Sequence, residues 1–469
     1  MSARAAWPLI VVGGGPAGIA AATEGAAAGL RCLLVDEAPA LGGQIYRQLP
    51  GAFQVADRRR LGRDHRRGDR LREALRRVGD RVEVRPATSV LDITADRRLM
   101  CSTPDGVAEL PAERLVLAAG AYDRPVPFPG WTLPGVLTAG GAQALMKSMR
   151  VRPGERALVA GTGPLLMVVA GQLHRAGVRV LAVLEAGRSA FTPGMLARAR
   201  RQWGLLRDGG RYRLELARAG IPVRYNFAVF EAHGAGLLHA VTYGPVDADW
   251  RPDRQRQHRV EVDLLVVGYG FVPSPELYDL AGCTMAYEHR LGGWVPVRDA
   301  TMQTTVPGVF AAGDGAGVAG AQVAVEEGRI AGITAAEQAG VLDAAAAVRR
   351  RRPAQRRLRG LAAVRAALDE ISYPRPGLAD LATDPTLLCR CEEVTRAEMA
   401  AAVAEGARDL QAVKLFTRLG MGACQGRNCA PSAAVLLGGT SGSAGRINPR
   451  PPARPVTLGA LARIHGGTK

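Results

Sequence analysis

The sequence predicts an α/β protein with two dinucleotide-binding, Rossmann-like domains and a small helical domain near the C-terminus. Two observations indicate the α/β part: a buried strand enters a glycine turn and a helix near residue 8, and the same order returns near residue 156. The third observation is a group of four cysteines between residues 389 and 429. At 469 residues the chain exceeds the size of one hydrophobic core, so several domains are expected.

The order of the segments predicts five parts. These are a first nucleotide-binding domain split between 1–150 and 295–343, a second one inserted at 151–294, an Arg- and Pro-rich helical connector at 344–384, a four-cysteine domain at 385–435 and an irregular tail at 436–469. The first domain is split because its last strand and helix follow the whole of the second domain.

The composition excludes some classes of function. With 47% apolar and 22% charged residues the chain resembles ordinary folded proteins. The net charge of +18 fits either a general arginine bias or a basic surface for a partner. Runs such as 349–352 lack interleaved aromatic residues, so no nucleic acid is expected, while an acidic subunit or redox partner stays open.

No targeting or membrane segment is predicted. The apolar run 7–12 enters a glycine turn directly, without the long apolar region or cleavage site of a signal peptide. The longest apolar stretch, 164–184, contains Gln172, His174 and Arg175, so we expect no transmembrane segment. The cysteines do not have the pattern of a secreted disulfide framework, and we expect a cytoplasmic protein.

The first glycine turn has the spacing of a dinucleotide fingerprint. In G-x-G-x-x-G order, the first glycine makes the tight turn, the second lets the backbone approach a pyrophosphate and the third allows close helix–strand packing. Asp36 ends the next strand, where a carboxylate can accept both ribose hydroxyls. The residues expected to contact the nucleotide here are Gly13, Gly15, Pro16, Ala17, Gly18, Asp36 and Glu37.

Later segments favour FAD over NAD at this turn. A second glycine-rich approach follows the ribose acid directly, and Asp314 follows a strand and a glycine, where it can bind a ribityl hydroxyl. The helix from about Gln322 can direct its positive end at the flavin. The further residues expected to contact FAD are Gly43, Gln44, Ala119, Gly120, Gly313, Asp314 and Gln322.

Three strand motifs carry a resemblance to a known class. The stretches 115–125, 264–273 and 309–314 resemble the crossing strands of the two-dinucleotide-fold flavoprotein reductases. The resemblance implies the disulfide-reductase-like flavoprotein fold from residue 8 to about residue 340.

Thiol chemistry of that class is not expected here. The sequence after Gly43 reads QIYRQLP, without the cysteine pair that disulfide reductases need beside the flavin. The isolated residues Cys32, Cys101 and Cys283 are typical of small buried apolar side chains.

The second glycine turn departs from the fingerprint. Gly161 and Gly163 are present, but Leu166 stands at the third glycine position. A leucine there displaces the helix or the dinucleotide, so hydride delivery from NAD(P)H is not the expected function. Glu185 suits an unphosphorylated ribose, and the site remains suited to ATP or another adenine nucleotide.

The four clustered cysteines form two close pairs in the sequence. Cys389 and Cys391 are followed, after a predicted helix at 396–405, by Cys424 and Cys429. Four thiolates can hold tetrahedral Zn²⁺ or a [2Fe–2S] cluster, whereas two disulfides are unfavourable in a cytoplasmic chain. A flavin upstream favours the cluster, and zinc or no metal remain alternatives.

The cysteine motifs CRCEEVT and GMGACQGRNC resemble the small [2Fe–2S] domain of the bacterioferritin-associated ferredoxin type. With the stretch 122–148, nearly the whole chain resembles the alpha (A) subunits of opine oxidase, hydrogen cyanide synthase B and the proline or D-hydroxyproline dehydrogenases. The resemblance implies a beta subunit similar to D-amino-acid oxidase that oxidises the amine, and a small ferredoxin-like gamma subunit. This chain would relay electrons through FAD and the cluster, with any membrane contact made through the electron acceptor.

No catalytic residue is predicted on this chain. Near the expected flavin no His or Glu is placed as a base, and Tyr46, Arg47 and Tyr122 are more typical of packing or flavin contact. Two other functions stay open: an NAD(P)H-dependent FAD reductase that feeds an iron–sulfur acceptor, and an FAD-binding redox sensor or scaffold without turnover. The substrate, the stoichiometry and the terminal acceptor are not predicted.

Overall fold

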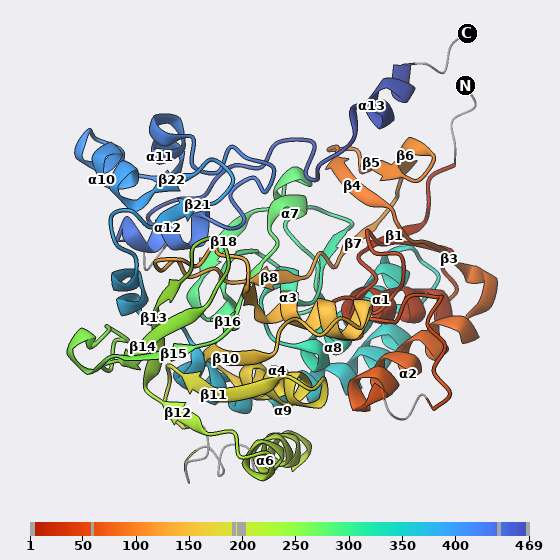
Figure 1. The fold of residues 1–469 in the computed structure, drawn as a ribbon. Coiled ribbons are helices and arrows are strands. Elements are labelled where there is room, and N and C mark those ends of the chain that lie inside the picture. Colours follow the sequence, from red (N-terminus) through yellow and green to blue (C-terminus); the bar gives the residue numbers. More distant parts are fainter. Residues whose placement is uncertain (1–4, 58–60, 190–193, 195–202, 439–441, 466–469) are drawn as a thin grey trace. The chain divides into compact units, whose positions relative to one another are not determined.

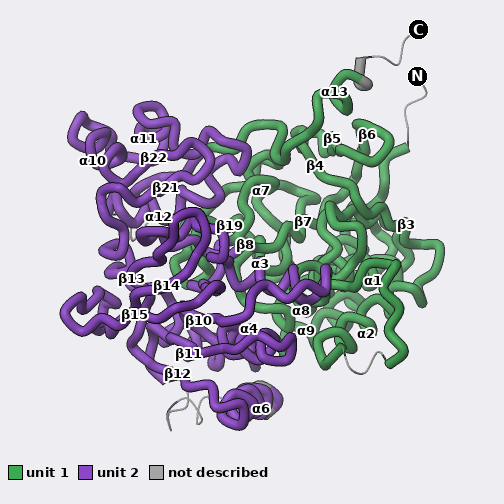
Figure 2. Tube along the Cα trace, in the orientation of Figure 1, with its two compact units in different colours: residues 1–121, 273–359, 448–469 green, residues 122–272, 360–447 purple. Residues whose placement is uncertain are grey.

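The computed structural model describes residues 5–57, 61–189, 194, 203–438 and 442–465. The chain divides into two compact units (Figure 2). Unit 1 comprises residues 1–121, 273–359 and 448–469, and unit 2 comprises residues 122–272 and 360–447. The division into five parts stays a prediction; by compactness, the cysteine region falls in the same unit as the second nucleotide-binding segment.

A five-stranded parallel sheet is the centre of unit 1 (Figure 1). Its strands, in spatial order, are β20 (Val309–Ala311), β7 (Leu115–Leu117), β1 (Leu9–Val12), β2 (Cys32–Val35) and β3 (Val82–Arg85). β1 and β2 are continuous apolar runs because both faces of the sheet are covered. An antiparallel sheet adds β4 (Ser89–Ile93), β5 (Arg98–Thr103) and β6 (Gly106–Pro111).

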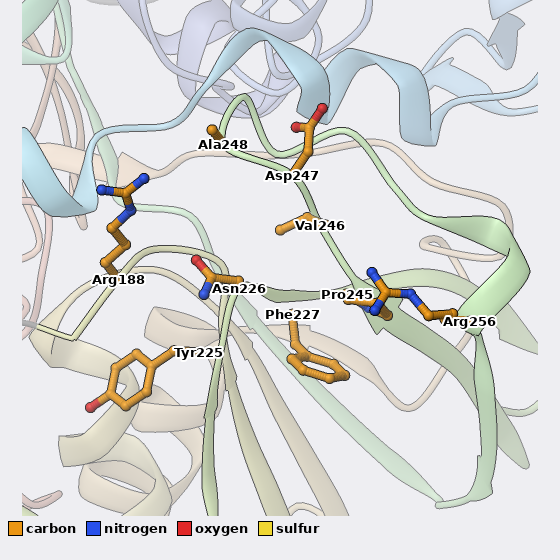
Figure 3. Close-up of a pocket in the computed structure, with 9 residues that line it drawn as sticks. All are labelled: Arg188, Tyr225, Asn226, Phe227, Pro245, Val246, Asp247, Ala248 and Arg256. Carbon is orange, nitrogen blue, oxygen red and sulfur yellow. The ribbon is translucent and has the colours of Figure 1, made fainter.

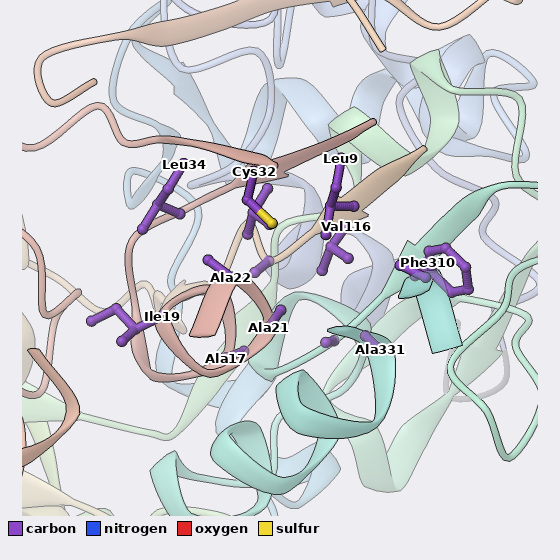
Figure 4. Close-up of a cluster of buried hydrophobic side chains, with 14 of the residues drawn as sticks. Leu9, Ala17, Ile19, Ala21, Ala22, Cys32, Leu34, Val116, Phe310 and Ala331 are labelled. Carbon is purple, nitrogen blue, oxygen red and sulfur yellow. The ribbon is translucent and has the colours of Figure 1, made fainter. Parts of the chain in front are cut away.

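Two helices pack tightly on this sheet, α1 (Pro16–Ala27) and α8 (Ala321–Gln338). A Cβ on Gly328 would lie 2.0 Å from the Ala17 carbonyl oxygen, so the helix backbones touch only because the residue is glycine. Small residues of α1 and the strands fill the core between them (Figure 4). The other helices of unit 1 are α2 (Arg63–Arg77), α7 (Glu276–Leu280) and α13 (Leu458–His465).

Unit 2 contains a second five-stranded parallel sheet. Its strands, in spatial order, are β12 (Val223–Tyr225), β11 (Arg179–Glu185), β10 (Arg156–Gly161), β16 (Leu264–Gly268) and β9 (Val136–Thr138). The accompanying helices are α3 (Ala139–Ala144), α4 (Pro164–Arg175) and α6 (Trp203–Arg218), and an antiparallel sheet comprises β13 (Phe227–His233), β14 (Ala240–Pro245) and β15 (His258–Glu261).

The cysteine region is a small part of unit 2 with its own core. It contains β21 (Leu387–Cys389), β22 (Val394–Thr395), α10 (Arg396–Ala404), α11 (Leu410–Thr417) and α12 (Ala430–Leu436). Two hydrogen bonds connect it to the stretch 122–148: Trp131 Nε1 donates to the Leu387 carbonyl at 2.7 Å, and Ser432 Oγ donates to the Pro125 carbonyl at 2.9 Å. The stretch that carried the family resemblance therefore supports the cysteine region.

Some local expectations differ from the structure. The segment 344–372 forms one long helix, α9 (Ala344–Ser372), which passes from unit 1 into unit 2. The tail is not entirely irregular, because it contains α13 and because Ala453 is fully buried against unit 1. In the described part of the chain, no helix has the length and apolar character that a membrane crossing requires.

Candidate flavin and iron–sulfur sites

The first glycine turn joins β1 to α1 and is very tight. Gly13 has φ +102°, and a Cβ there would lie 2.3 Å from the Ala118 carbonyl oxygen. A Cβ on Gly18 would lie 1.8 Å from the Gly13 carbonyl oxygen. Pro16 opens α1, where its fixed φ suits the first helical position and no N–H is needed. The N-terminus of α1 therefore meets the turn directly, as pyrophosphate binding requires.

Asp36 ties the turn to the end of β2. Its carboxylate accepts hydrogen bonds from the backbone N–H groups of Gly14 at 2.6 Å and Ala38 at 2.7 Å. Burial raises the pKa of this carboxyl, and the two N–H donors oppose the rise. The neighbouring Glu37 is paired with Arg454 of the C-terminal segment, with Nε and Oε2 3.1 Å apart. Asp36, rather than Glu37, therefore lies at the turn.

A second loop lies against the first turn within unit 1. A Cβ on Gly43, whose φ is +58°, would lie 2.8 Å from the Cα of Gly15. The buried guanidinium of Arg72, on α2, holds this loop by donating to the Tyr46 carbonyl at 3.3 Å. Gln44 is exposed and accepts a hydrogen bond from Arg47.

The remaining predicted flavin residues follow β7 and β20. A Cβ on Gly313 would lie 2.8 Å from the Cβ of Ala17, which brings the end of β20 onto the start of α1. Gly120, which follows Ala119, lies in turn against Gly315. Asp314 accepts hydrogen bonds from the N–H groups of residues 319 and 320 at 2.9 Å and orders the entry to α8. Gln322 is exposed near the start of that helix.

A buried ion pair, which the sequence analysis missed, supports this last turn. Glu327 on α8 accepts the Gly313 N–H at 2.8 Å and forms a two-point pair with Arg298, at 2.7 and 3.0 Å. Arg298 also donates to the Ala311 carbonyl at 2.7 Å. The pair fixes the chain between β20 and Asp314. No local motif indicated it, because its two residues lie in different elements.

The second glycine turn, in unit 2, repeats the carboxylate arrangement. Glu185 accepts hydrogen bonds from the N–H groups of Gly163 at 2.8 Å and Gly187 at 3.0 Å, and burial raises its pKa. Leu166 is accommodated in the core, where its side chain packs beside Gly268. A Cβ on Gly161 would lie 2.0 Å from the Gly268 carbonyl oxygen, so close approach is made to β16 instead.

The end of α9 covers part of this second turn. A Cβ on Gly187 would lie 2.5 Å from the Ile371 carbonyl oxygen, and one on Gly163 would lie 3.5 Å from the Cβ of Ser372. The chain itself therefore occupies space beside both N–H groups that hold Glu185.

A cavity of about 430 Å³ opens beside the second turn but is separate from its predicted ligands. Figure 3 shows two arginines and two aromatic side chains around it. The cavity is lined by Arg188, Tyr225, Asn226, Phe227, Pro245, Val246, Asp247, Ala248 and Arg256. None of Gly161, Gly163 and Glu185 is among them.

The four clustered cysteines come together as two pairs. A hydrogen bond from Cys429 lowers the pKa of Cys389 to about 5, and the same bond raises the pKa of Cys429. Cys391 is hydrogen-bonded to Cys424, and its pKa is raised by burial first and by this thiol. Among the described residues, no three His, Cys, Asp or Glu side chains surround one point in the way that a single metal ion requires.

The isolated cysteines have the expected surroundings. Cys32 and Cys101 are fully buried, Cys283 nearly so, and burial raises the pKa of each thiol. Tyr46 is also buried, with its side chain packed on Gly68 of α2. These residues are therefore part of the core, as predicted.

Two family models match the chain. The model for pyridine nucleotide-disulphide oxidoreductases matches residues 7–340, which contain both glycine turns. The chain belongs to this family. A second model, for the BFD-like [2Fe-2S] binding domain, matches residues 387–438 and includes all four clustered cysteines. The predicted FAD oxidoreductase with a C-terminal [2Fe–2S] domain is thereby confirmed at the level of family and domains.

Relatives match over nearly the full length. Hydrogen cyanide synthase subunit HcnB of Pseudomonas protegens is 37% identical over 466 residues, covering 96% of this chain and 97% of the relative. The alpha (A) subunit of opine oxidase from Rhizobium meliloti is 35% identical over 475 residues, covering 98% and 99%. The chain belongs to the family of these subunits, as the resemblance implied.

Solved structures confirm the predicted fold class. L-proline dehydrogenase from P. horikoshii superimposes with a TM-score of 0.69 at 22% identity, covering 97% of this chain and 79% of that chain. Thioredoxin reductase from T. acidophilum gives 0.53 at 18% identity, covering 71% and 98%. At these identities the likeness is one of fold.

Proposed function

We propose that this chain is the FAD- and [2Fe–2S]-carrying subunit of a multi-subunit dehydrogenase that oxidises an amino or imino acid. The observation that carries the proposal is one chain with a flavin-type turn and two cysteine pairs, similar over its length to named subunits of hydrogen cyanide synthase and opine oxidase. The oxidation itself would occur on a partner flavoprotein similar to D-amino-acid oxidase. A small ferredoxin-like subunit would complete the assembly.

The residues of the first turn fit FAD. Gly13 and Gly18 leave no room for side chains where the backbone meets the pyrophosphate, and Asp36 is placed at the ribose. Asp314 and the start of α8 would hold the ribityl and ring end, on the turn that Glu327 fixes. When bound, FAD accepts electrons in pairs and releases them singly, which suits a relay.

The donor set fits an iron–sulfur cluster better than zinc. A [2Fe–2S] cluster is held by four thiolates, two on each of its two irons, so two cysteine pairs match it. Cys389 has a lowered pKa and is ready to bind as a thiolate. We propose Cys389, Cys391, Cys424 and Cys429 as the ligands. Purified protein that contains zinc but neither iron nor acid-labile sulfide, when prepared anaerobically, would refute this assignment.

The relay is tested by asking what reduces the flavin. The chain is purified with and without its co-expressed partner flavoprotein and mixed anaerobically with NADH, NADPH, glycine, proline, D-hydroxyproline or octopine. We expect the flavin band near ~450 nm to bleach only with an amino or imino acid and only when the partner is present. Rapid bleaching by NADH or NADPH would instead support a self-sufficient reductase, and no bleaching at all would support a sensor or scaffold.

For the second turn we propose ATP or another adenine nucleotide as the ligand, without hydride transfer. Glu185 supports ribose binding, while Leu166 and the end of α9 leave less room than an open dinucleotide site. Chromatography of the acid-denatured protein should release an adenine nucleotide besides FAD. If FAD alone is released, the second turn is structural.

A further inference from the structure

The two cysteine pairs differ in exposure. Cys389 and Cys429 are each 1% exposed, whereas Cys391 is exposed and Cys424 is half-buried. A cluster held by these pairs would have one side inside unit 2 and the other side at the surface. Electrons pass to a partner where the path through protein is short, so the Cys391 side is the side that a partner can approach.

Apolar side chains gather beside this exposed pair. Leu415 and Phe416, at the end of α11, are 77% and 53% exposed, and Met421 in the following turn is 41% exposed. The turn touches the exposed pair directly, because a Cβ on Gly422 would lie 2.3 Å from the Cβ of Cys391. Single exposed apolar residues are ordinary, but three within seven positions beside a redox centre form a patch with a purpose.

The charges around this patch are mainly positive. Residues 410–429 contain Lys414, Arg418 and Arg427 and no acidic residue. The facing loop 389–393 adds one arginine and two glutamates, of which Glu392 is paired with Arg418 at 3.0 Å. A partner with an acidic face is complementary to this rim.

We propose that Leu415, Phe416 and Met421, with their basic rim, are the docking surface for a small acidic electron-carrier protein that has its own one-electron centre. This inference rests on the proposed function, because it requires a cluster at the four cysteines. One electron leaves this chain at each encounter and reduces the partner's centre, and no bond is made or broken. A patch of three apolar side chains in a charged rim suits a transient redox encounter rather than a permanent subunit interface, which is larger and more apolar.

Binding to a defined probe tests the proposal. Isothermal titration at low salt measures the affinity of the holoprotein, co-purified with its partner flavoprotein, for an acidic plant-type [2Fe–2S] ferredoxin. A basic cytochrome c serves as the opposite-charge probe. L415E and F416E should each weaken ferredoxin binding about tenfold or more, because each places a negative charge in the patch. L237E is the matched control: Leu237 is 70% exposed in the same unit, and its variant should bind as the wild type does.

The outcomes separate this inference from the proposed function. Iron and sulfide content, the cluster's EPR signal and partner co-purification are measured on every variant and should be unchanged. Failure of ferredoxin to bind, equal binding by the cytochrome, or wild-type affinity in both patch variants would overturn the docking surface and leave the relay intact. Loss of the partner flavoprotein from L415E would also overturn it, since the patch would then be a subunit interface. A wild type without any cluster overturns the proposed function itself.

Discussion

The two glycine turns share one design and differ at one decisive position. In both, a carboxylate at the end of the second strand accepts two backbone N–H groups, Asp36 in unit 1 and Glu185 in unit 2. The first turn, however, has no space for a side chain at Gly18, whereas the second accommodates Leu166 in its core. The carboxylate clamp therefore belongs to the turn, and the third glycine position distinguishes a flavin site from a packed one.

The largest effect is expected from Gly18→Ala. The new Cβ would lie 1.8 Å from the Gly13 carbonyl oxygen, so the turn must open where the pyrophosphate binds. The variant should be purified without FAD, as measured by the ratio of flavin to protein absorbance, with its far-UV circular dichroism retained. Stoichiometric FAD in this variant would show that the turn is not the flavin site.

Leu166→Ala should have the opposite result. Loss of a fully buried leucine costs about 3 kcal/mol of unfolding free energy, so the midpoint of denaturation falls. The FAD content should remain at the wild-type level, because the residue belongs to the second turn. A flavin-free L166A would contradict the separation of the two sites.

Asp36→Asn sharpens the comparison of the two carboxylates. We expect FAD affinity to fall about tenfold, since an amide accepts only at its oxygen and cannot receive both ribose and backbone donors as a carboxylate does. Glu185→Gln is the matched control and should leave FAD affinity unchanged. Equilibrium titration of FAD into the flavin-free proteins measures both.

The smallest effect concerns pH. Burial raises the pKa of Asp36, so this carboxyl protonates at a higher pH than an ordinary aspartate. FAD affinity should fall as the pH drops through that raised value, and D36N should not show this fall. Flavin-free protein should respond in the opposite direction: relative to D36N it gains stability as the pH falls from the raised value to the ordinary one, because the folded state then binds more protons. Parallel pH trends in the two proteins would contradict a role for Asp36.

Much of this architecture follows from local spacing in the sequence. Strand, turn and helix are adjacent in the chain, so Gly13 to Asp36 and the cysteine pairs are visible as motifs. The pair of Arg298 and Glu327 and the cover of the second turn by Ile371 are not visible, because they join segments that meet only after folding. The accommodation of Leu166 also depended on a distant glycine, Gly268.

The return of the C-terminal segment to unit 1 changes how the cysteine region relates to the rest. Ala453 donates its N–H to the Leu91 carbonyl at 2.7 Å, and Arg454 pairs with Glu37 beside Asp36. The chain thus leaves unit 1 to build the cysteine region and then comes back, so that region is an insertion and not an appendage. Truncation before residue 386 would strip the flavin unit of part of its own edge, and only an internal deletion that rejoins the flanking segments would remove the cysteines while leaving that unit whole.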